Sequence, residues 1–116
     1  MSKKMLKTLA AALDITVTGA KTPVALIETP FLGGQGRSAI LRFLGAVGGA
    51  GVLKIQGSNA LGNVAPASGD ASWFDIIAAF NAASALEQEI ELPRFLRINV
   101  GTAGTGTVTA LLEGIQ

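Results

Sequence analysis

A stretch of alternating apolar and polar residues near the C-terminal end of the chain constrains the fold most strongly. It has two runs, 95–100 and 107–112, joined by the glycine-rich segment 101–106. The apolar members of both runs would share one face: Leu96, Ile98, Val100, Val108, Ala110 and Leu112. The polar members would share the other: Arg97, Asn99, Thr107 and Thr109. Such alternation on both sides of a glycine-rich connection predicts a β-hairpin with one buried face, forming one wall of a β-sandwich.

Other runs of strand length occur along the whole chain. Their β-branched and apolar residues predict strands at 15–18, 24–29, 38–44, 52–58, 72–77 and 89–92. Residues 59–71 are small and turn-forming, which predicts a long surface loop, whereas 81–88 is more helix-like. With the hairpin, this makes about eight strands separated by turn signals. That pattern predicts an all-β, single-domain sandwich of the jelly-roll type.

Residues 1–13 are predicted to form an N-terminal arm, so that the sandwich domain would span 14–116. The apolar stretch between Lys7 and Asp14 is too short for the central region of a signal peptide. The arm would either fray or dock on its own domain, or it would insert into a neighbouring subunit. Because free termini usually fray, an ordered arm would favour insertion.

The composition limits the classes of partner. Of the 116 residues, 49% are hydrophobic and only 15% are charged, whereas about a quarter of residues are charged in a typical soluble domain. Apolar surface hidden against partners would explain this, so the composition favours an oligomer or a subunit of an assembly. No apolar run reaches the ~20 residues of a membrane-spanning helix. A net charge of +1 and 5% aromatic residues argue against nucleic-acid binding.

The residue types that most often carry catalysis are missing. The chain has no histidine and no cysteine, which removes the commonest general base, the commonest zinc ligands and any disulfide. The segment from Gly33 to Ser38 superficially resembles a phosphate-binding loop, but it lacks the Lys-Ser/Thr ending and a strand–loop–helix context. We therefore expect a flexible loop there, and a protein that is not an enzyme and binds no metal or cofactor.

Three glutamates repeat at a spacing of two. Glu87, Glu89 and Glu91 would share one face of a strand. A calcium site or a carboxylate pair for glycoside hydrolysis is one interpretation. The other is a solvated or salt-bridged face, with Arg94 and Arg97 as counter-charges, and this is the one that we expect.

The sole tryptophan also has two interpretations. Trp73 lies in an apolar run and is flanked by Asp70 and Asp75. The three side chains could hold a sugar ring. A lone tryptophan in an apolar run usually packs inside the protein, however, so Trp73 is predicted to be the core anchor of the sandwich.

Four stretches together carry a resemblance to known families: VLKIQGSN at 52–59, WFDI at 73–76, LPRFLRI at 92–98 and GTVTALLEG at 106–114. They resemble the jelly-roll cement or decoration proteins of tailed bacteriophages. The same layout is also similar to discoidin-type carbohydrate-binding modules. The chain departs from typical carbohydrate binders in having one tryptophan and no tyrosine.

The first resemblance implies a structural protein on the outer capsid surface of a virion, which binds between subunits of the major capsid protein and stabilises the shell. It implies a homo-oligomer, dimer or trimer, without a cofactor and without nucleic-acid or membrane partners. Contacts would come from the arm and from the loops at 33–37 and 59–71, through Lys3, Lys4, Lys7, Leu9, Arg37, Asn59 and Asn63. The alternative is a carbohydrate-binding module on a phage fibre or a secreted enzyme. A self-assembling shell or tail protein would share the same fold.

Overall fold

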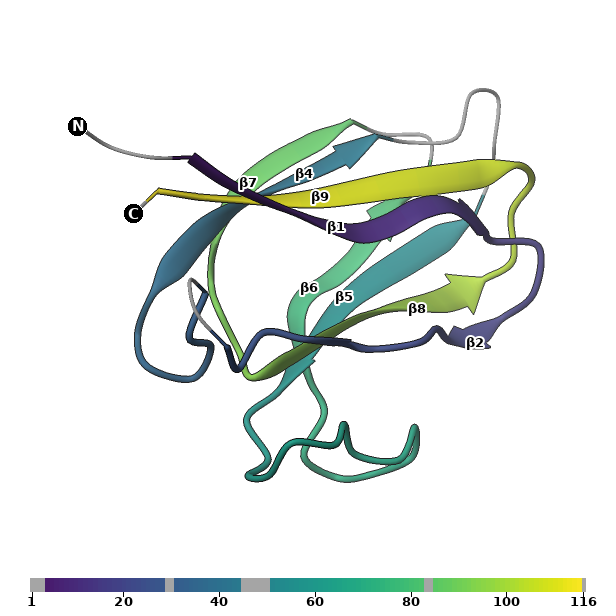
Figure 1. Ribbon diagram of the computed structural model, residues 1–116. Coiled ribbons are helices and arrows are strands. Elements are labelled where there is room, and N and C mark those ends of the chain that lie inside the picture. The colour runs from purple at the N-terminus through teal and green to yellow at the C-terminus, as the bar shows by residue number, and fades with distance from the viewer. Residues whose placement is uncertain (1–3, 29–30, 45–50, 83–84, 116) are drawn as a thin grey trace.

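Two antiparallel β-sheets pack face to face in the computed structural model of the protein, which describes residues 4–28, 31–44, 51–82 and 85–115 (Figure 1). The first sheet has the order β1 (Lys4–Asp14), β9 (Thr107–Ile115), β4 (Ser38–Leu44) and β7 (Leu86–Glu91). The second has the order β2 (Gly19–Ala20), β8 (Phe95–Thr102), β5 (Val52–Ser58) and β6 (Phe74–Asn81). A further short strand, β3 (Val24–Ala25), also pairs with β8.

The strand order is that of a jelly roll. β2 and β3 both pair with β8, at different points along it, so they act as one interrupted strand. Counted in this way, successive strands have the order 1-8-3-6 in the first sheet and 2-7-4-5 in the second. This is the arrangement produced by two interlocked Greek keys. The prediction of an all-β jelly-roll sandwich is therefore confirmed.

The predicted hairpin at the C-terminal end is wrong in its pairing, although its buried faces are right. β8 and β9 lie in opposite sheets, and the segment between them crosses from one sheet to the other. Leu96 and Val100 from β8 are buried, and so are Val108 and Leu112 from β9. Alternation records which face of a strand is buried. It does not record whether the next strand lies beside it or across the core.

The core lies between the two sheets and is made of alternate residues of the long strands. In β4 the buried residues are Ala39, Leu41 and Phe43, and in β5 they include Leu53 and Ile55. The ring of Phe43 meets that of Phe80 edge to face, with centroids 4.8 Å apart, a preferred geometry for aromatic pairs. The bounds predicted for these two strands, 38–44 and 52–58, are confirmed.

Strand predictions failed where short segments join the sheets. The strand expected at 15–18 is absent, and within 24–28 the expected strand is reduced to the two residues of β3, while residue 29 lies outside the described residues. Part of the helix-like segment 81–88 forms the start of β7, while 83–84 lie outside the described residues. The part of the chain that the structure describes contains no helix.

The N-terminal segment forms a strand where the sequence analysis predicted an arm. β1 pairs with β9 along its whole length, from Lys4 opposite Ile115 to Asp14 opposite Thr107. Leu9 is buried in the core, whereas it was predicted to lie on an arm that contacts a partner. The alternation of Leu9 with its neighbours is hidden by irregularities in the ladder between Thr8 and Leu13, because a bulge shifts the side chains that follow it to the other face.

Candidate functional site: a braced loop at one end of the sandwich

The loop between β5 and β6 is long, and hydrogen bonds hold it against the end of the sandwich. It spans residues 59–73 and extends from the lower end of the sandwich in Figure 1. The prediction of a long surface loop here is confirmed. At its base, the buried hydroxyl of Ser58 lies 2.7 Å from that of Ser72, which joins the two ends of the loop.

Arg94 holds the first half of this loop. Its Nε donates a hydrogen bond to the carbonyl of Ala60 (3.0 Å), and its second terminal nitrogen donates to the carbonyl of Gly62 (2.8 Å). Its backbone N–H donates to the side-chain oxygen of Asn59 (3.1 Å). A guanidinium presents several donors in a rigid plane, so one side chain fixes the course of several loop residues.

Arg97 and Trp73 hold the second half. A terminal nitrogen of Arg97 donates to the carbonyl of Ser68 (3.0 Å), and Trp73 Nε1 donates to the carbonyl of Ala67 (2.9 Å). The guanidinium carbon of Arg97 lies 4.0 Å from the centroid of the Trp73 ring, a cation–π contact. Arg97 is only 4% exposed, and this burial lowers the pKa of its guanidinium.

Trp73 is therefore not the core anchor that the sequence predicted. The ring is half-buried, and it packs against Arg97 on the outer face of the second sheet. Phe95, which lies two residues before Arg97, is completely buried on the same side of β8. Burial on this face comes from the loop rather than from the opposite sheet, which a sequence pattern cannot distinguish.

The bracing leaves two apolar side chains in solvent. Leu61 is 90% exposed and Val64 is 82% exposed, although the carbonyls on either side of Leu61 are both held by Arg94. A held loop with exposed apolar side chains is typical of a contact surface. Sequence reasoning missed this pair, although two large apolar residues within a loop of small residues were a visible signal.

The predicted contact residues divide into two groups. Asn59 and Asn63 lie in the braced loop, and Arg37 ends the neighbouring loop 32–37; all three are exposed. The two loops touch, since a Cβ added to Gly34 would lie 2.8 Å from the Arg94 side chain and 3.4 Å from that of Asn59.

The other predicted contacts come from β1. Lys4 and Lys7 belong to this strand of the first sheet, where Lys7 is half-buried and pairs with Leu112. Lys3 lies outside the described residues. The structure thus joins the two predicted contact loops and places the predicted arm residues on another element.

A row of polar side chains crosses the outer face of the second sheet beside the loop. Gln56 is its centre: its carbonyl oxygen accepts from Arg97 Nε (2.9 Å) and Asn99 Nδ2 (3.1 Å), and its Nε2 donates to Asp75 (2.9 Å). The ammonium of Lys54 lies 3.7 Å from Asp75. These five residues come from three neighbouring strands and form one connected network.

The aspartates that flank Trp73 have structural partners. Asp70 accepts a hydrogen bond from the backbone N–H of Ser72 (2.8 Å), which lowers the pKa of its carboxyl group. Asp75 belongs to the polar row. Both carboxylates of the trio are thus engaged in hydrogen bonds within the protein.

The glutamate row is in part a salt-bridged face, as predicted, but its counter-charge is different. Arg42 lies 2.9 Å from Glu87 and 2.8 Å from Glu113, a carboxylate that is largely buried. The hydrogen bond to Glu113, followed by the charge of Glu87, raises the pKa of Arg42. Arg94 and Arg97, which were predicted to pair with this row, are engaged in bracing the loop.

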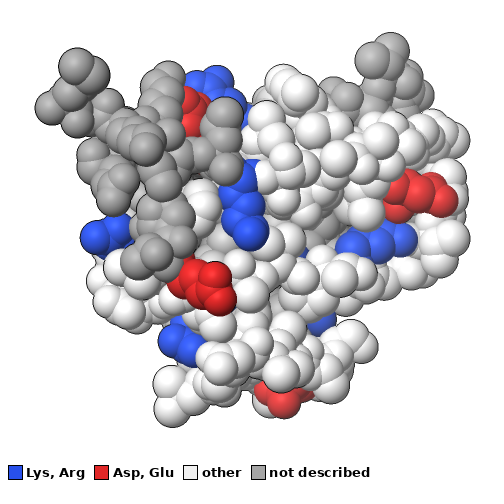
Figure 2. All heavy atoms as spheres, viewed as in Figure 1, with Lys and Arg blue, Asp and Glu red and all other residues white. Residues whose placement is uncertain are grey.

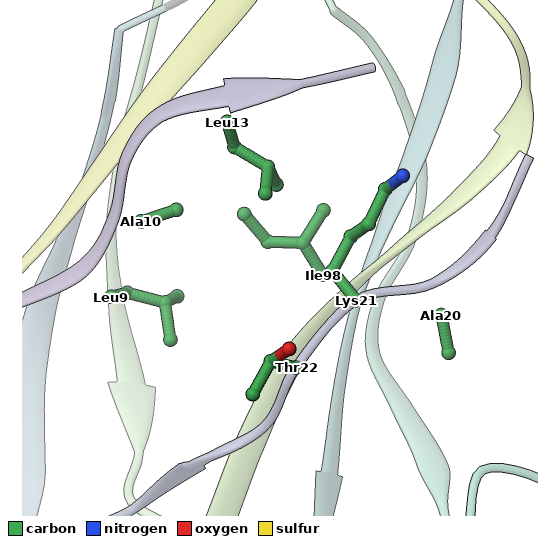
Figure 3. Close-up of a pocket in the computed structure, with 7 residues that line it drawn as sticks. All are labelled: Leu9, Ala10, Leu13, Ala20, Lys21, Thr22 and Ile98. Carbon is green, nitrogen blue, oxygen red and sulfur yellow. The ribbon is translucent and has the colours of Figure 1, made fainter. Parts of the chain in front are cut away.

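A separate cavity of about 310 Å³ opens between the two sheets, beside β1 (Figure 3). Leu9 and Leu13 reach into it from β1, and Ile98 faces them from β8. Its polar lining side chains are Lys21 and Thr22, from the segment that follows β2. An apolar hollow with a polar rim is typical of a site that receives an apolar group.

Neither metal sites, nor membrane spans, nor likeness to known proteins assigns a function. Among the described residues, no cluster of acidic, histidine or cysteine side chains is placed to hold a metal ion. No helix in the described ranges is long and apolar enough to cross a membrane. Comparisons with protein-family models, with curated proteins and with solved structures found no match.

Proposed function

We propose that the protein is a capsid cement or decoration protein, which binds between major capsid subunits and stabilises the shell of a virion. The observation that carries this proposal is the braced loop, because it holds Leu61 and Val64 in solvent at 90% and 82% exposure. Two arginines fix the backbone around these side chains. A structural protein that acts by contact needs such a surface and needs no catalytic group.

Bracing increases the affinity that such a loop can reach. A free loop loses conformational entropy when it binds, and this loss subtracts from the energy gained by burying apolar surface. Arg94 and Arg97 already restrict the loop in the free protein. Burying an exposed leucine or valine side chain contributes roughly 1.5–3 kcal/mol. Repeated contacts on a lattice would add avidity.

The rest of the molecule is consistent with this role. Jelly rolls are a common architecture of virion proteins. Arg37, Asn59 and Asn63 are exposed around the same end of the sandwich, where they would form a polar rim around an apolar centre. Interfaces commonly have this arrangement.

Co-sedimentation with purified capsids that lack the protein tests the proposal. The variants are Leu61→Asp and Val64→Asp, and the control is Ala103→Asp, which places the same charge on an exposed residue outside the loop. We expect each loop variant to bind roughly tenfold to a hundredfold more weakly and the control to bind like the wild type. Equal binding by all four proteins would refute the contact surface, and absence of wild-type binding would refute the function.

A second candidate function is carbohydrate binding, and the polar row favours it. Asn99, Gln56 and Lys54 are half-buried on a sheet face beside the Trp73 ring, and such amide and ammonium groups suit sugar hydroxyls. One face of the ring is covered by Arg97, which leaves less of it for stacking. Titration with glycans would test this function: quenching of Trp73 fluorescence that Asn99→Ala abolishes would support it.

A further inference from the structure

The cavity between the sheets lies within a small surface patch that carries complementary features. Leu9, Leu13 and Ile98 form an apolar hollow of about 310 Å³. The segment 14–22 runs along one side of it, from the end of β1 to the residues that follow β2. In Figure 3 the side chains of Leu13 and Ile98 point toward each other from opposite sheets, and Lys21 rises beside them.

The same segment carries an exposed apolar side chain. Val17 is 62% exposed, and its carbonyl accepts a hydrogen bond from the ammonium of Lys21, which lines the cavity (3.2 Å). A valine side chain is small enough to enter a hollow of this size. The patch therefore contains both an apolar hole and an apolar knob.

The patch also carries one charge of each sign. Lys21 lines the cavity, and Asp14 directly follows the lining residue Leu13. Asp14 accepts hydrogen bonds from the backbone N–H (2.8 Å) and the hydroxyl (2.7 Å) of Thr16, and Lys21 donates to the carbonyl of Val17, so both charges are held on the turn that joins β1 and β2. Asp14 is exposed and Lys21 is half-buried, and no ion pair joins them within the described part of the chain.

We propose that this patch is the interface of a homodimer with twofold symmetry. In such a dimer the same surface is used by both copies, so each feature must find its complement on the same patch. Val17 of each copy enters the cavity of the other, and Lys21 of each copy faces Asp14 of the other. A second copy fits better than another partner because the knob, the hole and both charges are present together.

The surrounding surface suits a dimer. Figure 2 shows that most of the described atoms on the face seen in Figure 1 belong to uncharged residues. Homodimer interfaces are more apolar than the rest of a protein surface. β1 is also an edge strand of the first sheet, and a long edge strand is usually protected in some way. The dimer would protect it.

Sedimentation equilibrium of the full chain tests whether Val17 makes the dimer contact. The variant is Val17→Asp, and the matched control is Thr18→Asp, the exposed neighbouring residue. We expect a wild-type dimer, a control that dimerises like it, and a Kd for Val17→Asp raised by roughly a hundredfold, because a carboxylate would enter an apolar cavity. A monomeric wild type, or a Val17→Asp dimer of unchanged Kd, would overturn the proposal.

Charge reversal tests the pairing and separates it from misfolding. Lys21→Glu alone and Asp14→Lys alone each place like charges opposite each other across the twofold axis, so both variants should be monomers. Mixed together they restore two attractive pairs, so a heterodimer should form. Folded single variants that stay monomeric in the mixture would overturn the assignment of the charges. A small molecule found in the cavity by native mass spectrometry would also overturn the second copy as occupant.

The homodimer rests on the proposed function, because it would be the contact between copies of the protein on a capsid lattice. Dimerisation and capsid binding can nevertheless be refuted independently. Val17→Asp is tested in the capsid co-sedimentation assay. Capsid binding by the monomeric variant would leave the cement function standing without any need for a dimer. A wild-type dimer that binds no capsid would leave the interface standing and refute the cement function.

Discussion

Replacing Arg97 with alanine tests how the loop is held. The expected loss in the free energy of unfolding can be worked out from the contacts of this side chain. The guanidinium donates to Gln56 (2.9 Å) and to the Ser68 carbonyl (3.0 Å), and it stacks on Trp73 at 4.0 Å. Hydrogen bonds to charged groups contribute about 1.5–3 kcal/mol each, and a desolvated cation–π contact about 2 kcal/mol. Against this stands the cost of burying the charge, which the lowered pKa of Arg97 reflects. We expect a net loss of about 2–3 kcal/mol in the free energy of unfolding.

The assay uses the sole tryptophan of the chain. Trp73 lies in the loop region and stacks on Arg97, so its fluorescence during urea unfolding reports stability, and acrylamide quenching reports loop opening in the native state. Arg97→Ala should increase quenching before global unfolding begins. Arg97→Met keeps most of the side-chain volume and separates lost packing from lost charge. A stability change below about 0.5 kcal/mol, within the range of ordinary surface substitutions, would refute the bracing role.

Three further outcomes are expected. Trp73→Ala should lower the free energy of unfolding in urea by about 1–2 kcal/mol, because the ring is half-buried. A loss of about 3–5 kcal/mol, typical of a core aromatic, would instead place Trp73 in the core. Gly33→Ala should cost at least about 2 kcal/mol, since the added Cβ would lie 1.9 Å from the Pro93 carbonyl oxygen. Gly69→Ala, where an added Cβ meets nothing within 4 Å, is its control, and equal stabilities would contradict the packing. The pKa of Asp70 is lowered from 3.8 in the folded state. The stabilising contribution of its carboxylate is therefore present above pH 3.8 and is lost as the pH falls through the lowered pKa. NMR titration should show the lowered pKa, and stability should fall less on acidification in Asp70→Ala than in the wild type.

The sequence was enough to predict where the contact loops lie, but not which residues hold them in place. Asn59, Asn63 and Arg37 were assigned to contact loops, and the structure brings those loops together at one end. The bracing by Arg94 and Arg97 was not predicted, because an arginine in a strand does not reveal which loop folds over it. Leu9 was assigned to a partner contact and lies in the core, since the irregular ladder of β1 hides its pattern.

The class of fold and the inward faces of the long strands could be predicted from the pattern of residues along the chain. Side chains alternate between the two faces of any strand, so the burial of Leu96, Ile98, Val108 and Leu112 follows from local order alone. In contrast, the three-dimensional fold was needed to show that β8 and β9 lie in opposite sheets and that residues 4–14 form a strand. Strand partners depend on contacts between residues far apart in the chain, and the same apolar face can be buried by a neighbouring strand, by the opposite sheet or by a loop.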